Sequence, residues 1–183
     1  MRSVTAVAGL AVLAACATPP VPAPVVDDSA VFTADGRMSV VVARDSAPQA
    51  SSGKFNWVEH ASTSQIVFFS PLGDTVAQIE VSPARSVLRT PQWSEEAQDP
   101  ETLLERNLGF ALPVLGLRDW LRGRARDGAV RAPEPFVEDG WQVSFPQMQA
   151  QGGLPRIVRL QRALPEPVDV RIVIDHWNGE GAR

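Results

Sequence analysis

The chain has 183 residues, of which 17 are Lys or Arg and 21 are Asp or Glu, so its formal net charge at neutral pH is −4. An acidic chain without a long basic stripe is a poor candidate for binding nucleic acid, and it should repel anionic lipid rather than adhere to it. Cys16 is the only cysteine, which excludes an internal disulfide and means that the fold must rest on apolar burial.

The N-terminus has the layout of a bacterial export signal. Arg2 precedes a largely apolar stretch from Val4 to Ala15, which is shorter than the ~20 residues that a membrane-spanning helix needs. The small residues before Cys16 resemble the bacterial lipobox, a signal after whose cleavage the cysteine becomes the acylated first residue. We therefore expect residues 1–15 to be a signal peptide and Cys16 to carry lipid. The alternative is an ordinary signal peptide in which Cys16 is incidental.

Residues 16–31 are rich in proline and show neither helical nor alternating periodicity. Such a segment stays extended, at ~3.1 Å per residue where it is polyproline-like. We interpret it as a lipidated tether that holds the folded domain away from the bilayer, and the alternative is a disordered N-terminus with no role.

The next part of the chain has the period of two that is typical of β-strands. Met38, Val40 and Val42 alternate with less apolar neighbours, and the pattern recurs after each turn signal. The segments join through short turns, which favours a meander of antiparallel strands. Strands are predicted around residues 38–43, 54–58, 66–69, 74–81 and 87–88.

Two helices interrupt the strands. The first is predicted to begin at Asp99-Pro100-Glu101, where an N-cap residue precedes a proline at the first helical position, and to end at Gly109. The second follows Pro113 and ends at Gly123. Arginines crowd the C-terminal end of this second helix, where cations suit the helix dipole, and we expect them to assist the approach of a partner rather than the fold. They are Arg118, Arg122, Arg124 and Arg126.

Strands resume after the second helix. Asp139-Gly140 is a hairpin signal, and the segment from Val168 to Ile174 alternates cleanly. The order of many strands, two helices and further strands predicts one curved antiparallel sheet with the helices on its concave side. We assign residues 32–178 to this domain and residues 179–183 to a C-terminal tail.

Sites for catalysis, metals and cofactors are poorly supported. The only histidines, His60 and His176, lie far apart and neither neighbours a nucleophile motif. No cluster with metal-ligand spacing and no glycine-rich phosphate loop occurs. We expect no catalytic residues, no metal and no cofactor. The five tryptophans and other apolar residues then leave two interpretations open, a packed core or the lining of an apolar pocket.

A set of short motifs resembles the LolB family of outer-membrane lipoprotein receptors, and they occur in order from about residue 32 to 178. The matching stretches are Gly36-Arg37-Met38-Ser39-Val40, Gly53-Lys54-Phe55-Asn56-Trp57, Ser70-Pro71-Leu72-Gly73, Leu117-Arg118-Asp119-Trp120-Leu121-Arg122-Gly123, Gly140-Trp141-Gln142-Val143 and Ile174-Asp175-His176-Trp177. One departure is that the proline-rich segment stands where the family often has an N-terminal helix.

The resemblance implies an incomplete antiparallel β-barrel whose helices close a hydrophobic cavity for acyl chains. It also implies a receptor that accepts lipoproteins from a soluble LolA-like periplasmic carrier and inserts them into the outer membrane. The partners would be that carrier, client lipoproteins and the membrane, and we expect a lipid-anchored monomer on the periplasmic leaflet. Ala17 agrees with this location, because in enteric bacteria an aspartate there favours the inner membrane.

Alternation assigns nine apolar residues to the inward face that would line the cavity, and where both faces of a strand are apolar the pattern does not fix which parity points inward. They are Met38, Phe55, Trp57, Val67, Ile79, Leu104, Trp120, Phe145 and Ile172.

Leu72 is unusual because a large aliphatic side chain sits within a turn between two predicted strands. From the residues alone, it would fold back onto the core. The resemblance implies instead that it protrudes and serves membrane insertion. Two rival classes of protein stay open for the whole chain: a lipid-modifying enzyme, in which His176 would face a serine in a cavity, and a structural lipoprotein with a closed core.

Overall fold

A computed structural model describes residues 30–44, 47–108 and 111–179. The predicted signal peptide, Cys16 and most of the tether lie outside the described residues, as does the tail after Gly179. Neither helix in the described part is long and apolar enough to cross a bilayer.

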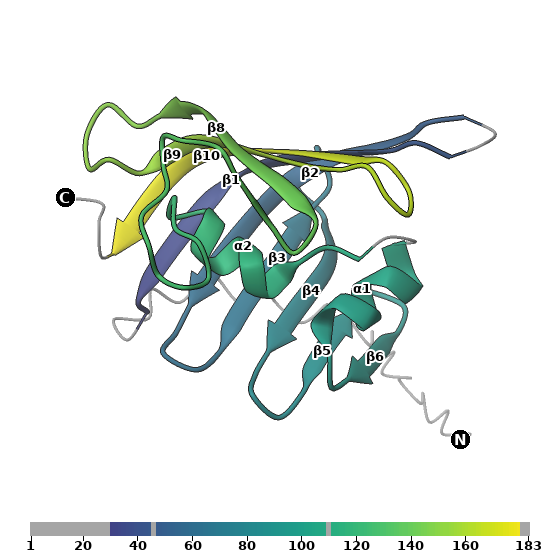
Figure 1. Cartoon of the computed structure of the whole chain (residues 1–183). Helices are drawn as coiled ribbons and strands as arrows, with labels where there is room; N and C mark the ends of the chain where they lie inside the picture. Colours follow the sequence, from purple (N-terminus) through teal and green to yellow (C-terminus); the bar gives the residue numbers. More distant parts are fainter. Residues whose placement is uncertain (1–29, 45–46, 109–110, 180–183) are drawn as a thin grey trace, which may run out of the picture.

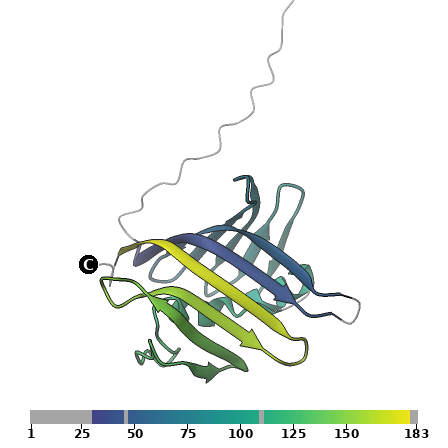
Figure 2. The same ribbon diagram turned by 90° about the horizontal axis from the view of Figure 1, so that it is seen from above.

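The ten strands of the described residues form a single antiparallel sheet, in the order β6-β5-β4-β3-β2-β1-β10-β9-β8-β7. The edge strands β6 and β7 do not pair with each other, so the sheet curves without closing (Figures 1 and 2). The strands are β1 (Phe32–Val42), β2 (Gln49–Glu59), β3 (Ser64–Phe69), β4 (Thr75–Val81), β5 (Ser86–Arg89), β6 (Ser94–Ala97), β7 (Phe136–Glu138), β8 (Trp141–Met148), β9 (Pro155–Arg162) and β10 (Val168–Gly179). The expectation of an open antiparallel half-barrel is confirmed.

Two strands had no clear signal in the sequence. β6 has the sequence Ser-Glu-Glu-Ala, which lacks apolar alternation, and β7 has only three residues. Both form because a neighbouring strand presents an open edge to which their backbone can hydrogen-bond. The predicted strand at 38–43 is also longer than expected, since β1 begins at Phe32.

Both predicted helices are present on the concave side of the sheet (Figure 1). α1 (Pro100–Leu108) begins as predicted, with the backbone N–H of Thr102 donating to Asp99 Oδ2 at 2.8 Å. The Thr102 hydroxyl also donates to this carboxylate, and this hydrogen bond lowers the pKa of Asp99. α2 (Val114–Trp120) is shorter than predicted, because its last turn opens at residues 121–123 and Gly123 adopts a φ of 71°.

The core fills the space between the concave face and the helices. Inward residues of β10, such as Val170 and Ile174, meet Leu104 of α1 and Trp120 of α2 in one buried cluster. Trp57, Trp120 and Trp141 are buried, whereas Trp93 is substantially exposed. For these three tryptophans the interpretation as core aromatics is therefore correct.

The strand registers give the half-barrel two rims. The proximal rim holds the start of β1 and the connections β2–β3, β4–β5 and β8–β9. The distal rim holds the connections β1–β2, β3–β4, β5–β6, β7–β8 and β9–β10. The tether therefore reaches the domain at the proximal rim, and Leu72 lies on the distal rim.

Candidate lipid-binding site

A groove of about 370 Å³ opens on the concave face near the distal rim. Its apolar wall includes inward residues of β1, β3 and β4, namely Met38 and Val40 of β1, Phe68 of β3 and Ala77 of β4, and β2 runs between β1 and β3. These four side chains are partly buried and pack against the core cluster, so the floor of the groove is continuous with the core. The volume lies in the range of small-molecule sites, ~300–1,000 Å³.

The rim of the groove is more polar than its wall. Gln49, Ser51 and Ser52 of β2 line one side, and Ser70 and Pro71 of the β3–β4 connection line another. An apolar chain that lies on the wall would therefore have a polar end near water. Such a combination suits an amphiphilic ligand.

The β3–β4 connection is a tight turn that holds Leu72 out in solvent. The backbone N–H of Gly73 donates to the Ser70 carbonyl at 2.9 Å, and that of Ser70 donates to the Asp74 carbonyl at 2.8 Å. Gly73 has a φ of 102°, which favours glycine, and Leu72 is 93% exposed. The alternative in which Leu72 folds back onto the core is therefore wrong. Because Pro71 lines the groove, Leu72 stands directly beside its opening.

The nine residues predicted to line a cavity occupy three different environments. Met38 lines the groove. Val67 was assigned to the wrong face: it pairs with Asn56 and Gln78, whereas its neighbour Ile66 is in the core. The error has a simple cause, since the run from Ile66 to Phe69 is apolar on both faces and hides the parity. The other seven are buried in the core cluster between the sheet and the helices, and they are Phe55, Trp57, Ile79, Leu104, Trp120, Phe145 and Ile172.

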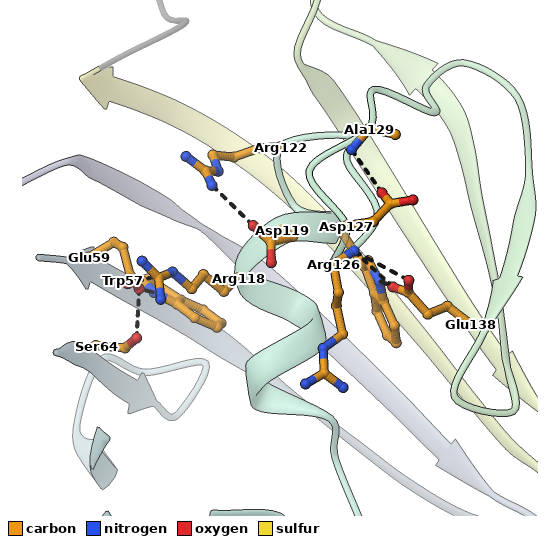
Figure 3. Close-up of polar contacts among 11 residues, drawn as sticks. Trp57, Glu59, Ser64, Arg118, Asp119, Arg122, Arg126, Asp127, Ala129 and Glu138 are labelled. Atoms are coloured by element: carbon orange, nitrogen blue, oxygen red, sulfur yellow. Dashed lines mark hydrogen bonds and ion pairs between the residues drawn. The ribbon is translucent and has the colours of Figure 1, made fainter. Parts of the chain in front are cut away.

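A buried carboxylate ties α2 to the sheet (Figure 3). Glu59, at the end of β2, is 1% exposed, and Arg118 of α2 pairs with its Oε1 at 2.8 Å. Its other oxygen accepts hydrogen bonds from Trp57 Nε1 at 3.0 Å and the Ser64 hydroxyl at 2.6 Å. Sequence reasoning missed Glu59, although its parity with Phe55 and Trp57 places it on the inward face.

A second tie joins the last residue of α2, Trp120, to β7. Trp120 Nε1 donates to Glu138 Oε2 at 2.6 Å, and the backbone N–H of Arg126 donates to the same oxygen at 3.2 Å. The Arg126 guanidinium pairs with Asp139, also at 2.6 Å. The two carboxylates of the Glu138–Asp139 segment thus hold the helix and the chain that follows it.

The arginines of this region are largely engaged within the fold. Besides Arg118, Arg122 pairs with Asp119 at 3.1 Å and stacks over Phe32, with its Cζ 5.3 Å from the ring centre. The expectation that these arginines do not serve the fold is therefore wrong for Arg118, Arg122 and Arg126, whereas their part in the approach of a partner stays a prediction. Arg124 is exposed, and its backbone bridges to Val130.

The histidines do not form the arrangement that a lipid-modifying enzyme would need. His176 is exposed on β10, and His60 lies in the β2–β3 connection. Within residues 30–44, 47–108 and 111–179, no group of His, Cys, Asp or Glu could hold a metal ion.

Comparison with known proteins decides the family. The model of the family described as "Outer membrane lipoprotein LolB" matches residues 30–177, which is nearly the whole described domain. The chain belongs to the LolB family. This confirms the resemblance drawn from the ordered motifs, and the open sheet with its two helices is consistent with the LolB fold.

Individual LolB relatives match along most of their length. A protein of Dechloromonas aromatica is 33% identical over 92% of this chain and 93% of its own length. A protein of Bordetella pertussis is 37% identical over 90% of this chain and 87% of its own length. A protein of Cupriavidus necator is 36% identical over 76% of this chain and 77% of its own length. Each of the three is named "Outer-membrane lipoprotein LolB".

Proposed function

We propose that this chain is a lipid-anchored receptor of the outer membrane that binds the acyl chains of lipoproteins in its concave groove and passes them to the bilayer. The single observation that carries the proposal is the apolar groove that opens beside the exposed Leu72. The names of the relatives support the outer-membrane location and the lipoprotein class.

The groove has the chemistry that acyl chains require. Exposing an acyl chain to water costs ~0.8 kcal/mol per CH₂, so a lipoprotein cannot cross an aqueous compartment without a partner that covers its chains. Met38, Val40 and Phe68 present an apolar wall, and the serines of β2 lie where a polar head would sit. Transfer from a LolA-like carrier to this receptor and on to the membrane then needs only a gradient of affinity.

The groove is one end of a larger potential site. The seven predicted lining residues of the core belong to the cluster on which the groove's wall packs, five of them on strands and two, Leu104 and Trp120, on α1 and α2. We propose that long acyl chains spread these helices from the sheet and reach this cluster. The short length of the helices, nine and seven residues, supports such a movement, because each has little surface to hold it.

Cys16 and the tether complete the proposal. An acylated Cys16 would fix the domain to the membrane, and residues 16–31 would allow it to move relative to the surface. Mass spectrometry of the mature N-terminus tests this step. An unmodified Cys16, or cleavage at another site, would contradict lipid anchoring through Cys16.

Neighbouring valines on β1 offer a matched test of acyl binding. Val40 lines the groove, whereas Val41 faces outward and is 41% exposed. We expect Val40→Glu to lower the affinity for fatty acid at least about tenfold, as measured by displacement of a fluorescent fatty acid. A carboxylate in an apolar site costs more than ~1.4 kcal/mol. Val41→Glu should leave displacement unchanged.

The outcome also separates the proposed receptor from its rival. If the wild-type chain binds no fatty acid, or if the two variants behave alike, then the groove is not a ligand site. The chain would in that case be better described as a structural lipoprotein.

A further inference from the structure

A second, smaller groove lies on the outward face of the sheet, over β1, β2 and β10. Figure 2 shows these three strands running side by side. It has a volume of about 260 Å³ and carries three cationic side chains, Arg37, Lys54 and Arg171. The hydroxyl-bearing residues Ser39 and Ser52 lie between them. We call these five residues the outer cationic patch.

Of the three cations, only Arg37 forms an ion pair within the part of the chain that the structure describes. Arg37 donates to Asp175 at 2.9 and 3.1 Å, and this bidentate pair lowers the pKa of Asp175. Lys54 and Arg171 form no ion pair with any residue that the structure describes, although Arg171 lies near enough to Asp169 to influence that carboxylate. The patch is therefore locally positive on a chain whose net charge is −4.

The position of the patch links it to Leu72. Pro71, the residue before Leu72, lines both the outer groove and the concave groove, as do Ser52 and Lys54, whereas Arg37 and Arg171 line only the outer groove. A cationic, hydroxyl-rich surface thus adjoins a protruding aliphatic side chain. The cationic patch would suit the phosphate layer of a membrane interface, and Leu72 would suit the start of the acyl region beneath it.

We propose that the outer cationic patch binds phosphate groups of bilayer phospholipids while Leu72 enters the interface beside them. This inference rests on the proposed function and adds the headgroup contact that would orient the domain. Guanidinium and ammonium groups suit phosphate oxygens, and the nearby serine hydroxyls add further donors. Because the chain as a whole is acidic, the patch would steer this one face toward an anionic surface.

The length of the tether permits this orientation. The domain begins at the proximal rim, and β1 has eleven residues, so about 33 Å of strand separate that rim from the distal end. The sixteen residues 16–31 have a maximum reach of about 53 Å. Arg37 and Lys54 lie midway along β1 and β2, level with the end of β3 that leads to Leu72. A lipid on Cys16 and the patch can therefore contact the same bilayer.

Lys54 is the only lysine in the chain, which allows a site-specific test. The lipidated protein carrying Arg85→Lys has a reference amine on the β4–β5 connection of the proximal rim. The readout is the acetylation rate of Lys54 relative to position 85, followed by mass spectrometry. We expect this ratio to fall at least about fivefold between neutral detergent micelles and vesicles of phosphatidylethanolamine and phosphatidylglycerol, since one cation near such a surface contributes ~1 kcal/mol.

Two controls test the electrostatic origin of the protection. Arg171→Gln should reduce the protection of Lys54 by about fivefold, whereas Arg89→Gln, the same change at the exposed pair with Glu80, should leave it intact. About 1 M salt, with a Debye length of ~3 Å, should abolish it.

Three results would overturn the proposal. The first is an unchanged ratio in vesicles. The second is equal protection by inorganic phosphate in micelles, which would assign the patch to a free anion. The third is protection only by the protein carrier, which would assign it to an acidic protein surface. Fatty-acid displacement by the same variants reports on the concave groove separately, so failure of the patch and failure of the proposed receptor function are distinguishable.

Discussion

The two rims of the half-barrel are built by the same strands but differ in what they expose. Six of the eight large apolar side chains that are exposed in the described residues lie at the distal rim or within two residues of it: Val41, Leu72, Val76, Trp93, Val137 and Leu164. The proximal connections, residues 60–63, 82–85 and 149–154, expose none.

This difference between the rims does not follow from the strand pattern. Strand alternation buries one face along the whole length of the sheet, so it cannot make one rim apolar and the other polar. Leu72, Trp93 and Leu164 lie in the connections, which carry function on many rigid scaffolds, and the other three are outward residues near the ends of strands. At the proximal rim, by contrast, the ion pair between Glu59 and Arg118 holds α2 against the sheet.

The largest effect on stability is expected from the proximal rim. Arg118→Ala removes the cationic partner of Glu59, a carboxylate that is almost fully buried. We expect the free energy of unfolding to fall by about 3 kcal/mol, the lower end for a broken buried pair, because hydrogen bonds from Trp57 and Ser64 remain. Urea denaturation measures the loss.

The control is an ion pair on the surface. Arg106→Ala breaks the exposed pair with Glu95 and should change stability by less than about 1 kcal/mol. Adding Glu59→Gln to Arg118→Ala should restore part of the lost stability, since a neutral amide is cheaper to bury than an unpaired charge. Equal effects of Arg118→Ala and Arg106→Ala would contradict the role given to Glu59.

A smaller effect is expected at the start of α1. Asp99→Ala removes the N-cap and should lower the free energy of unfolding by about 1 kcal/mol. The pKa of Asp99 is lowered in the folded state, so its contribution is present above its unfolded value near 4 and is lost as the pH falls through the folded value. Unfolding curves at a series of acidic pH values should therefore show that wild type and Asp99→Ala converge. A difference that persists undiminished at the lowest pH would contradict this origin.

The smallest effect on stability is expected at the tip of the distal rim. Leu72 is 93% exposed, so Leu72→Glu should change the free energy of unfolding by about 0.5 kcal/mol or less. Fatty-acid displacement should also stay close to that of the wild type. A large loss of stability would mean that Leu72 contacts the core.

The fold was predictable from the sequence wherever one face of an element differs from the other. β10 alternates cleanly and α1 begins with an N-cap signal, and both lie close to where the pattern placed them. The parity of Val67 was not predictable, because the run in β3 is apolar on both faces. β6 was also missed, since its strand character comes from pairing with β5 rather than from its own residues.

The candidate site was less predictable than the fold. Pro71 and Gly73 are residues typical of a turn, so the sequence indicates an exposed connection in which the aliphatic Leu72 is unusual. The pattern could not show which part of the apolar inward face is packed and which part is open, because this depends on where short helices end. Met38 lies beyond their cover and Phe55 beneath it, although both have the alternation of an inward residue.

The most direct test of the account is delivery of a client lipoprotein from carrier to vesicles in a reconstituted assay. Leu72→Glu, at the distal rim, is compared with Ala84→Glu, which places the same carboxylate on an exposed connection of the proximal rim. We predict that the Leu72→Glu variant accepts the lipoprotein from the carrier but fails to release it into the membrane. The Ala84→Glu variant should deliver the lipoprotein normally. Normal delivery by Leu72→Glu, or equal failure of both variants, would contradict the assignment of membrane transfer to the distal rim.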